Sequence, residues 1–187
     1  RRHTRYPLVT GVQTCALPIF LDGIVDIYLP DLKYADSATG FEVSKIRDYR
    51  EHSRAAIKEM FRQKGADLIF GEDGMLQSGL VIRLLVLPND LGGISESLEW
   101  IRDELSPKVA VSLMAQYYPT HKAATDGRHI LLSRRITPTE WANAVEALDR
   151  TGLENGFMQE YESAAHYYRP DFNDRDRPFK DIRDFEG

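Results

Sequence analysis

The stretch Ile24–Lys33, IVDIYLPDLK, decides the expected fold. It is rich in Ile, Val, Tyr and Leu, which is typical of a buried β-strand. Because side chains alternate along a strand, one face carries apolar residues followed by charged ones: Val25, Ile27, Leu29, Asp31 and Lys33. Parallel α/β enzymes have their sites at the carboxyl ends of the strands. The stretch therefore predicts a strand that is buried on both faces and ends at a functional site.

Strands and helices alternate along the rest of the chain. The apolar runs Leu80–Leu87 and Lys108–Tyr117 indicate two more buried strands, and Leu153–Gln159 a short one. Amphipathic helices are expected over Ser53–Gln63, Ser95–Leu105 and Thr137–Thr151, each capped by its first residue. In the last of these, Thr137, Pro138 and Glu140 form a capping-box pattern. This order predicts an α/β fold with a parallel sheet and right-handed crossovers.

Two connections have their own signals. Tyr34–Asp48 contains several turn-forming residues and is expected to be a loop. The Asp73-Gly74 pair lies between apolar residues, which predicts a small β-hairpin.

Composition limits the class of protein. The chain has 187 residues and a formal net charge of −5, and 42% of its residues are hydrophobic. One domain of this length can bury a sizeable core. The negative charge argues against a general affinity for nucleic acid or anionic membranes. No apolar run reaches the roughly 18 residues of a membrane span, so the expected location is the cytoplasm.

Metal-binding patterns are missing from the sequence. The single cysteine, Cys15, is fewer than the three or four thiolates that typically hold an iron–sulfur cluster or a structural zinc ion. His129 and His166 have no partners at ligand spacing, and His121 has the character of a solvated loop residue. No metal site is predicted.

The amino terminus has an unusual composition. Val9–Ile19, VTGVQTCALPI, resembles the translated sequence of a short-read library adapter. We therefore expect residues 1–19 not to belong to the natural chain, residues 20–159 to form the domain, and residues 160–187 to form an irregular tail.

Polar residues on the predicted strands mark the candidate site: Asp31, Lys33, Arg83 and Gln116. A buried arginine needs a partner, because an unpaired buried charge costs several kcal/mol. One interpretation is an internal ion pair of Asp31 with Arg83 or Lys33. The other is a carboxylate-bearing ligand that is held by the planar fork of Arg83 and oriented by the other two charges. Lys33 is also a candidate nucleophile for a Schiff base.

Four ordered motifs together resemble the C-terminal half of a radical SAM protein, closest to uncharacterised iron–sulfur homologues of pyruvate formate-lyase activating enzyme. They are YLPDLKY (Tyr28–Tyr34), GLVIRLLVLPNDLGG (Gly79–Gly93), AQYYP (Ala115–Pro119) and RRITPTEW (Arg134–Trp141), and PDF…PFKD in Pro170–Asp181 also fits.

The resemblance implies a TIM-like partial (β/α)6 barrel, a [4Fe–4S] cluster and S-adenosylmethionine, which together generate a 5′-deoxyadenosyl radical. Activating enzymes use that radical to abstract hydrogen from a glycine of a partner protein. By resemblance, Asp31 and Lys33 lie near the methionine moiety, with Asp31 a candidate cation ligand, and Arg83 contacts S-adenosylmethionine.

The family's C-x-x-x-C-x-x-C motif is not in this sequence. We therefore expect this chain alone to be inactive, with neither cofactor bound. The alternatives are a Schiff-base lyase on a (β/α) barrel, which would use Lys33, and a non-catalytic binding domain.

Overall fold

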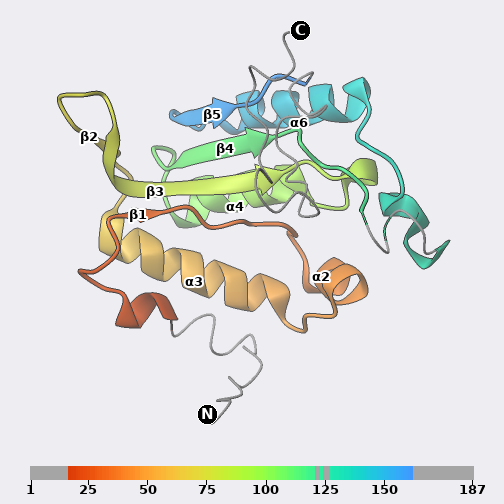
Figure 1. Ribbon diagram of the computed structural model, residues 1–187, viewed down its shortest axis with the longest axis horizontal. Helices are drawn as coiled ribbons and strands as arrows, with labels where there is room; N and C mark the ends of the chain where they lie inside the picture. The colour runs from red at the N-terminus through yellow and green to blue at the C-terminus, as the bar shows by residue number, and fades with distance from the viewer. Residues whose placement is uncertain (1–16, 121–122, 124–126, 162–187) are drawn as a thin grey trace, which may run out of the picture.

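The computed structural model describes residues 17–120, 123 and 127–161. The segment before Leu17, the side chain of His121 and the tail from residue 162 lie outside the described residues. Four strands, β1 (Ile27–Tyr28), β3 (Leu76–Leu85), β4 (Ala110–Met114) and β5 (Gly156–Met158), are parallel in the order β1-β3-β4-β5 (Figure 1). A further strand, β2 (Ile69–Phe70), pairs antiparallel with β3.

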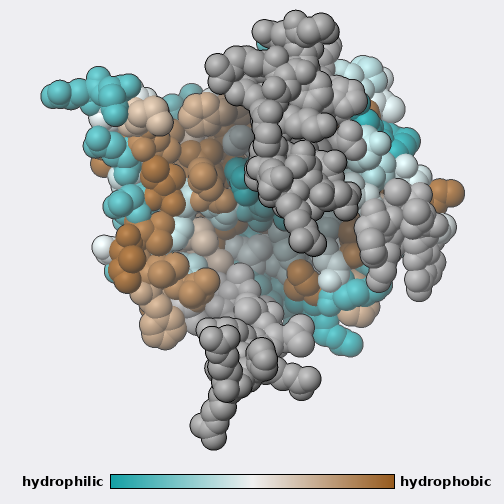
Figure 2. All heavy atoms as spheres, viewed as in Figure 1, coloured by the Kyte–Doolittle hydropathy of each residue, from teal (hydrophilic) through white to brown (hydrophobic). Residues whose placement is uncertain are grey.

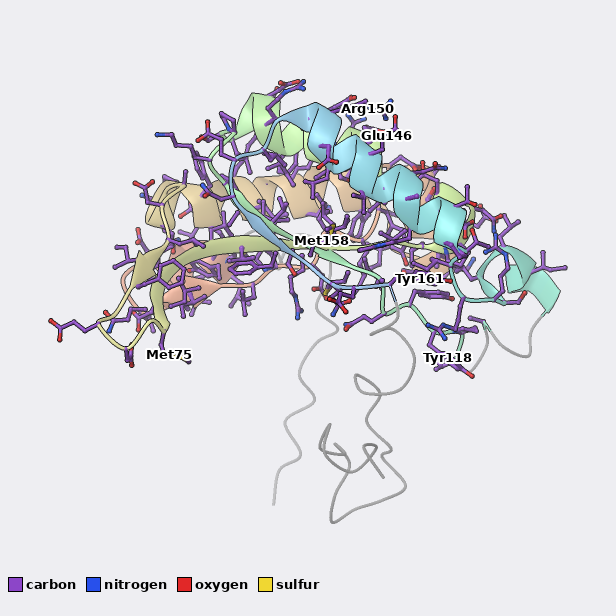
Figure 3. The ribbon with its side chains drawn as sticks, turned by 90° about the horizontal axis from the view of Figure 1, so that it is seen from above. Met75, Tyr118, Glu146, Arg150, Met158 and Tyr161 are labelled. Carbon is purple, nitrogen blue, oxygen red and sulfur yellow. The ribbon has the colours of Figure 1, made fainter. Side chains whose placement is uncertain are left out.

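Helices cover one face of this sheet (Figure 3). They are α3 (Tyr49–Lys64), α4 (Ile94–Glu104) and α6 (Pro138–Thr151), while the short α2 (Ser37–Ser44) lies beyond the end of β1. Two short 3-10 helices, Pro88–Asp90 and Gly127–Leu132, lie in connections. This parallel sheet with flanking helices is the α/β class that the sequence predicts. No helix in the described part is long and apolar enough to cross a membrane.

The core lies between the sheet and the helices. Alternate residues of β3 point toward it and are almost completely buried: Leu80, Ile82 and Leu84. Ile57 of α3 and Ile101 of α4 belong to the same apolar cluster. Burial of such side chains stabilises the fold by about 1.5–3 kcal/mol each, so this layer fixes which face of β3 is turned away from the helices.

The prediction that Ile24–Lys33 is a strand buried on both faces is wrong. Only Ile27–Tyr28 is a regular strand, because Pro30 has no N–H to donate to a ladder. Tyr28 and Leu32 face the core, whereas the side chain of Leu29 is 52% exposed. Parallel pairing resumes after the proline, where the backbone N–H of Leu32 donates to the carbonyl of Arg83 at 2.9 Å.

Two helices begin where no side-chain cap is present. Helix α3 follows Asp48 rather than beginning at Ser53, and α4 follows Gly93 rather than beginning at Ser95. Both preceding residues have a left-handed backbone and no side-chain capping hydrogen bond. Serine is a preferred cap residue, so the sequence pattern indicated Ser53 and Ser95 instead of these two starts.

The region predicted as the loop Tyr34–Asp48 contains α2. The side chain of Asp36 caps this helix by accepting a hydrogen bond from the N–H of Thr39 at 2.8 Å. The weak apolar periodicity of α2, whose only buried residue is Gly40, explains why the pattern did not reveal it.

Several local predictions are confirmed. Helix α6 has the complete capping box of Thr137 and Glu140, and Gly152 ends it. The Asp73-Gly74 turn joins β2 to β3, and β5 lies within the predicted short strand. Strand β3 begins four residues earlier than predicted, at Leu76. Strand β4 is shorter than the predicted Lys108–Tyr117.

Candidate functional site

A pocket of about 180 Å³ lies at the carboxyl ends of the parallel strands. Its lining residues are Asp31, Lys33, Arg83, Leu85, Met114 and Gln116. All four residues that the sequence marked as a site are therefore in one place. The carboxyl edge of a parallel sheet is where α/β proteins place their ligands.

The strand register brings the charged residues together. Asp31 and Arg83 are opposite each other in a parallel bridge between neighbouring chain segments. Lys33 lies two residues beyond Asp31, and Leu85 lies two residues beyond Arg83. Leu85 pairs with Met114 in the parallel register between β3 and β4. Because residues two apart share a face, these side chains lie on the face that is opposite the helices.

The Asp31 carboxylate lies between two cations. Its Oδ2 is 3.1 Å from Lys33 Nζ, and its Oδ1 is 2.6 Å from Arg83 Nη2. The side chain of Asp31 is 32% exposed, that of Lys33 is 48% exposed and that of Arg83 is 40% exposed. Both ion pairs that the sequence suggested are present, in a water-accessible setting where such pairs add little stability. One positive charge remains in excess.

The Arg83–Asp31 pair leaves polar atoms unsatisfied. Arg83 Nε is buried and has no hydrogen-bond partner among the described residues. Asp31 Oδ1 is close to Arg83 Nη2 but lacks the alignment of a hydrogen bond, and it too is buried without one. An unsatisfied buried donor or acceptor costs about 1–3 kcal/mol. The ion pair therefore leaves two buried atoms without partners, beside an Arg83 side chain that is 40% exposed.

Arg83 is more accessible than the sequence suggested. A fully buried strand would have required an internal partner for its charge. Because no helix of the described part covers its face of the sheet, its guanidinium reaches solvent through the pocket.

Gln116 is held by a residue that sequence reasoning missed. Its Oε1 accepts a hydrogen bond from Gln159 Nε2 at 3.0 Å, and Gln159 Oε1 accepts from the N–H of Ala115, also at 3.0 Å. This arrangement fixes the oxygen of the Gln116 amide and leaves its NH₂ group as the donor for the pocket. A single glutamine after a short strand gives no sequence signal of this role.

Tyr49 also supports the site without being recognisable in the sequence. Its hydroxyl accepts a hydrogen bond from the backbone N–H of Lys33 at 2.9 Å. Its ring packs edge-on against Tyr34, with centroids 5.1 Å apart. Burial raises the pKa of Tyr49, so the hydroxyl stays protonated. It holds the segment that carries Lys33.

A larger pocket of about 340 Å³ lies between α4 and α6, but two of its acidic groups are already engaged. Glu140 binds Arg134 through two contacts of 2.8 Å, and Glu146 lies 3.8 Å from Arg150. The smaller pocket is the better candidate because it combines excess charge with unsatisfied atoms. Among the described residues, no group of three or more His, Cys, Asp or Glu is placed to bind a metal ion.

Comparison with known proteins gives one distant relative. The chain is 31% identical over 135 residues to an uncharacterised protein of Methanocaldococcus jannaschii, a match that covers 72% of this chain and 34% of the relative. The chain thus spans about a third of the length of that curated relative. No family model matches the chain, and no solved structure does. The relative's name states no activity that could be compared with the pocket.

Proposed function

We propose that the chain is part of an activating-enzyme-like radical SAM protein of the cytoplasm, and that its pocket binds the methionine moiety of S-adenosylmethionine. The observation that carries the proposal is the meeting of Asp31, Lys33, Arg83 and Gln116 in one pocket with an unsatisfied arginine donor. These residues come from separate motifs of the sequence, and the resemblance assigns Asp31, Lys33 and Arg83 to the same ligand.

The pocket has groups that suit an amino-acid ligand. Arg83, whose side chain is 40% exposed, offers its guanidinium to a carboxylate, and Asp31, which is 32% exposed, offers an acceptor to an ammonium group. At about 180 Å³ it is smaller than the roughly 300–1,000 Å³ of most ligand pockets, so it suits one end of a larger molecule. Bound S-adenosylmethionine supplies radical hydrogen abstraction in this family. The chain's own residues would orient the methionine end and neutralise its charges.

The [4Fe–4S] cluster of the proposed family does not fit this chain. Cys15 is its single cysteine, and a cluster is held by three or four thiolates. In the proposal, the cluster ligands and the remaining strands of a (β/α)6 barrel belong to another part of a longer protein. The described sheet, with helices on one face, suits an arc of such a barrel. The substrate of this longer protein would be a glycyl-radical-type partner protein.

The lyase alternative lacks support from the geometry. A Schiff-base lysine must reach its neutral amine form, usually through burial in an apolar pocket. Lys33 is 48% exposed, and its Nζ lies 3.1 Å from Asp31 Oδ2, so it is not enclosed in an apolar pocket.

NMR titration of this chain tests the pocket directly. S-adenosylmethionine and methionine at millimolar concentrations should shift the Arg83 Nε–H and Gln116 side-chain signals, whereas adenosine should not. Arg83→Met, which lacks the Nε–H group, should abolish the shift of the Gln116 side-chain signals and keep the fold. Arg102→Met is the matched control, because Arg102 lies on α4 and pairs with Asp103 outside this pocket. Unfolding of Arg83→Met, or unchanged shifts in that variant, would favour the purely structural ion pair.

The genomic sequence upstream of the Phe20 codon tests the family. An in-frame C-x-x-x-C-x-x-C motif supports the proposal, and a reading frame without one contradicts it. Binding of about four irons by the present chain after anaerobic reconstitution would also contradict it, because Cys15 is its sole thiolate.

A further inference from the structure

The β2–β3 hairpin, residues 67–79, exposes a group of large apolar side chains. Ile69 is 57% exposed, Phe70 52% and Met75 66%. The hairpin projects beyond the sheet at the amino end of β3 (Figure 1), and Met75 lies at the opposite end of the molecule from Tyr118 (Figure 3). In Figure 2, apolar side chains gather on this side of the molecule beneath a hydrophilic tip. Exposed apolar clusters of this kind mark interaction sites.

Hydrogen bonds hold the hairpin in a defined shape. The N–H of Gly71 donates to the carbonyl of Met75 at 2.8 Å, and the N–H of Gly74 to the carbonyl of Gly71 at 3.0 Å. Asp73 Oδ1 accepts from the N–H of Met75 at 3.0 Å. Gly74 takes the left-handed backbone conformation, with φ at 76°, that the turn requires. The apolar side chains are therefore presented without a large ordering cost on binding.

The same hairpin is acidic and has an open edge. It carries Asp67, Glu72 and Asp73, and no Lys or Arg occurs from residue 65 to residue 82. Within the described residues, none of these three carboxylates is part of an ion pair. Strand β2 pairs with β3 alone among the described strands, so the backbone of its other edge is unpaired.

We propose that this hairpin is a docking site for an extended segment of a partner protein that is rich in Lys or Arg and carries apolar side chains. The apolar side chains would cover Ile69, Phe70 and Met75, and the cations would pair with the carboxylates of Glu72 and Asp73. The backbone of the segment would extend the sheet at the free edge of β2, a common mode of peptide binding.

Charge complementarity selects this occupant over others. A second copy of the chain would bring a net charge of −5 against an acidic hairpin, and anionic lipid or nucleic acid would be repelled in the same way. The hairpin lies at the amino end of β3, and the Asp31–Arg83 pocket lies at the carboxyl end. A docked segment therefore leaves the pocket accessible, and the inference does not depend on the proposed function.

The test is an NMR titration of the chain with an octapeptide of alternating Lys and Leu at low salt, beside an alternating Glu–Leu octapeptide. The basic peptide should shift signals of residues 67–79 and leave those of Arg83 and Gln116 unchanged. The double variant Glu72→Lys/Asp73→Lys should weaken binding by at least about tenfold, because it reverses the charge facing the peptide. Phe70→Ser should have a similar effect with an unchanged Tm.

Ile130→Ser is the matched control. Ile130 is 70% exposed but lies in the connection that leads to Arg134 and Arg135, so its replacement should leave binding unchanged. Equal binding of the acidic peptide, or equal affinity for the charge-reversed variant, would overturn the proposal. A dimer in analytical ultracentrifugation that Phe70→Ser dissociates would also overturn it, because a second copy would then occupy the site. If Phe70→Ser fails to fold, the charge-reversed variant decides the outcome.

Discussion

Replacement of Glu140 by Gln tests the contacts that fix the start of α6 to the loop after β3. The Glu140 carboxylate accepts hydrogen bonds from Arg134 Nη1 and Nη2, each at 2.8 Å. It also accepts from the N–H of Asn89 at 2.6 Å and from the N–H of Thr137 at 2.8 Å. The side chain is 19% exposed, so water screens these contacts only in part.

The expected loss follows from the nature of these bonds. A hydrogen bond to a charged group contributes about 1.5–3 kcal/mol, and a helix cap contributes about 1 kcal/mol. Gln keeps the shape and one acceptor oxygen but loses the charge. After allowance for screening, Glu140→Gln should lower the free energy of unfolding at pH 7 by about 2–3 kcal/mol.

The difference between the two proteins should depend on pH. The bidentate Arg134 contact holds the pKa of Glu140 well below its usual value of 4.5, and the N–H groups of Asn89 and Thr137 add to this effect. The stabilisation is therefore present above pH 4.5 and is lost as the pH falls toward the folded-state pKa. From pH 7 to pH 3 this group should contribute a loss of about 2 kcal/mol in the native protein and none in Glu140→Gln.

Urea unfolding, followed by the fluorescence of Trp100 and Trp141 at pH 7, 5 and 3, measures both effects. Glu146→Gln is the control on the same helix, because Glu146 is 67% exposed and its contact to Arg150 is 3.8 Å. Its effect should stay below about 0.5 kcal/mol at each pH. If the unfolding free energies of the native protein and Glu140→Gln differ by the same amount at pH 7 and pH 3, the low pKa and the network that explains it are refuted.

Two further predictions concern the core and the backbone. Ile101 is completely buried, so Ile101→Ala should lower the free energy of unfolding by about 2–5 kcal/mol. Leu29→Ala, at a half-exposed position, should lower the free energy of unfolding by less than about 1 kcal/mol in the same urea experiment. If Leu29→Ala and Ile101→Ala lowered it equally, the sheet face opposite the helices would have to be covered. Gly93 has φ at 62°, and a Cβ there would lie 2.6 Å from Ala35 Cβ. Gly93→Ala should therefore lower Tm by several degrees more than Gly152→Ala, where the backbone is also left-handed but no atom lies within 4 Å.

Much of the architecture was predictable because its signals are local. The capping box at Thr137 and the turn at Asp73-Gly74 involve residues within four positions of each other, and both are present in the structure. Helix α2 and the true start of α3 were not predicted. The Asp36 cap of α2 is local, but the helix buries only Gly40 and so shows only weak apolar periodicity. Helix α3 begins after Asp48, which makes no side-chain capping hydrogen bond and so gives no start signal.

The candidate site could be predicted as a set of residues but not as a geometry. Charged residues in the apolar runs indicated Asp31 and Arg83, and the structure brings these two residues together in one pocket. The support from Gln159 could not be predicted, because it comes from pairing between segments about 40 residues apart in sequence.

The sequence by itself determined the alternation of strands and helices, the capping and turn residues, and the charges at the strand ends. These depend on backbone sterics and on periodicities of a few residues. Only the tertiary structure decided which face of each strand is buried. Pro30 interrupts the ladder, and the helices pack on one side, so Tyr28 and Leu32 are buried while Asp31 and Lys33 reach solvent beside Arg83. Burial is a property of what packs against a residue, and that is fixed by distant parts of the chain.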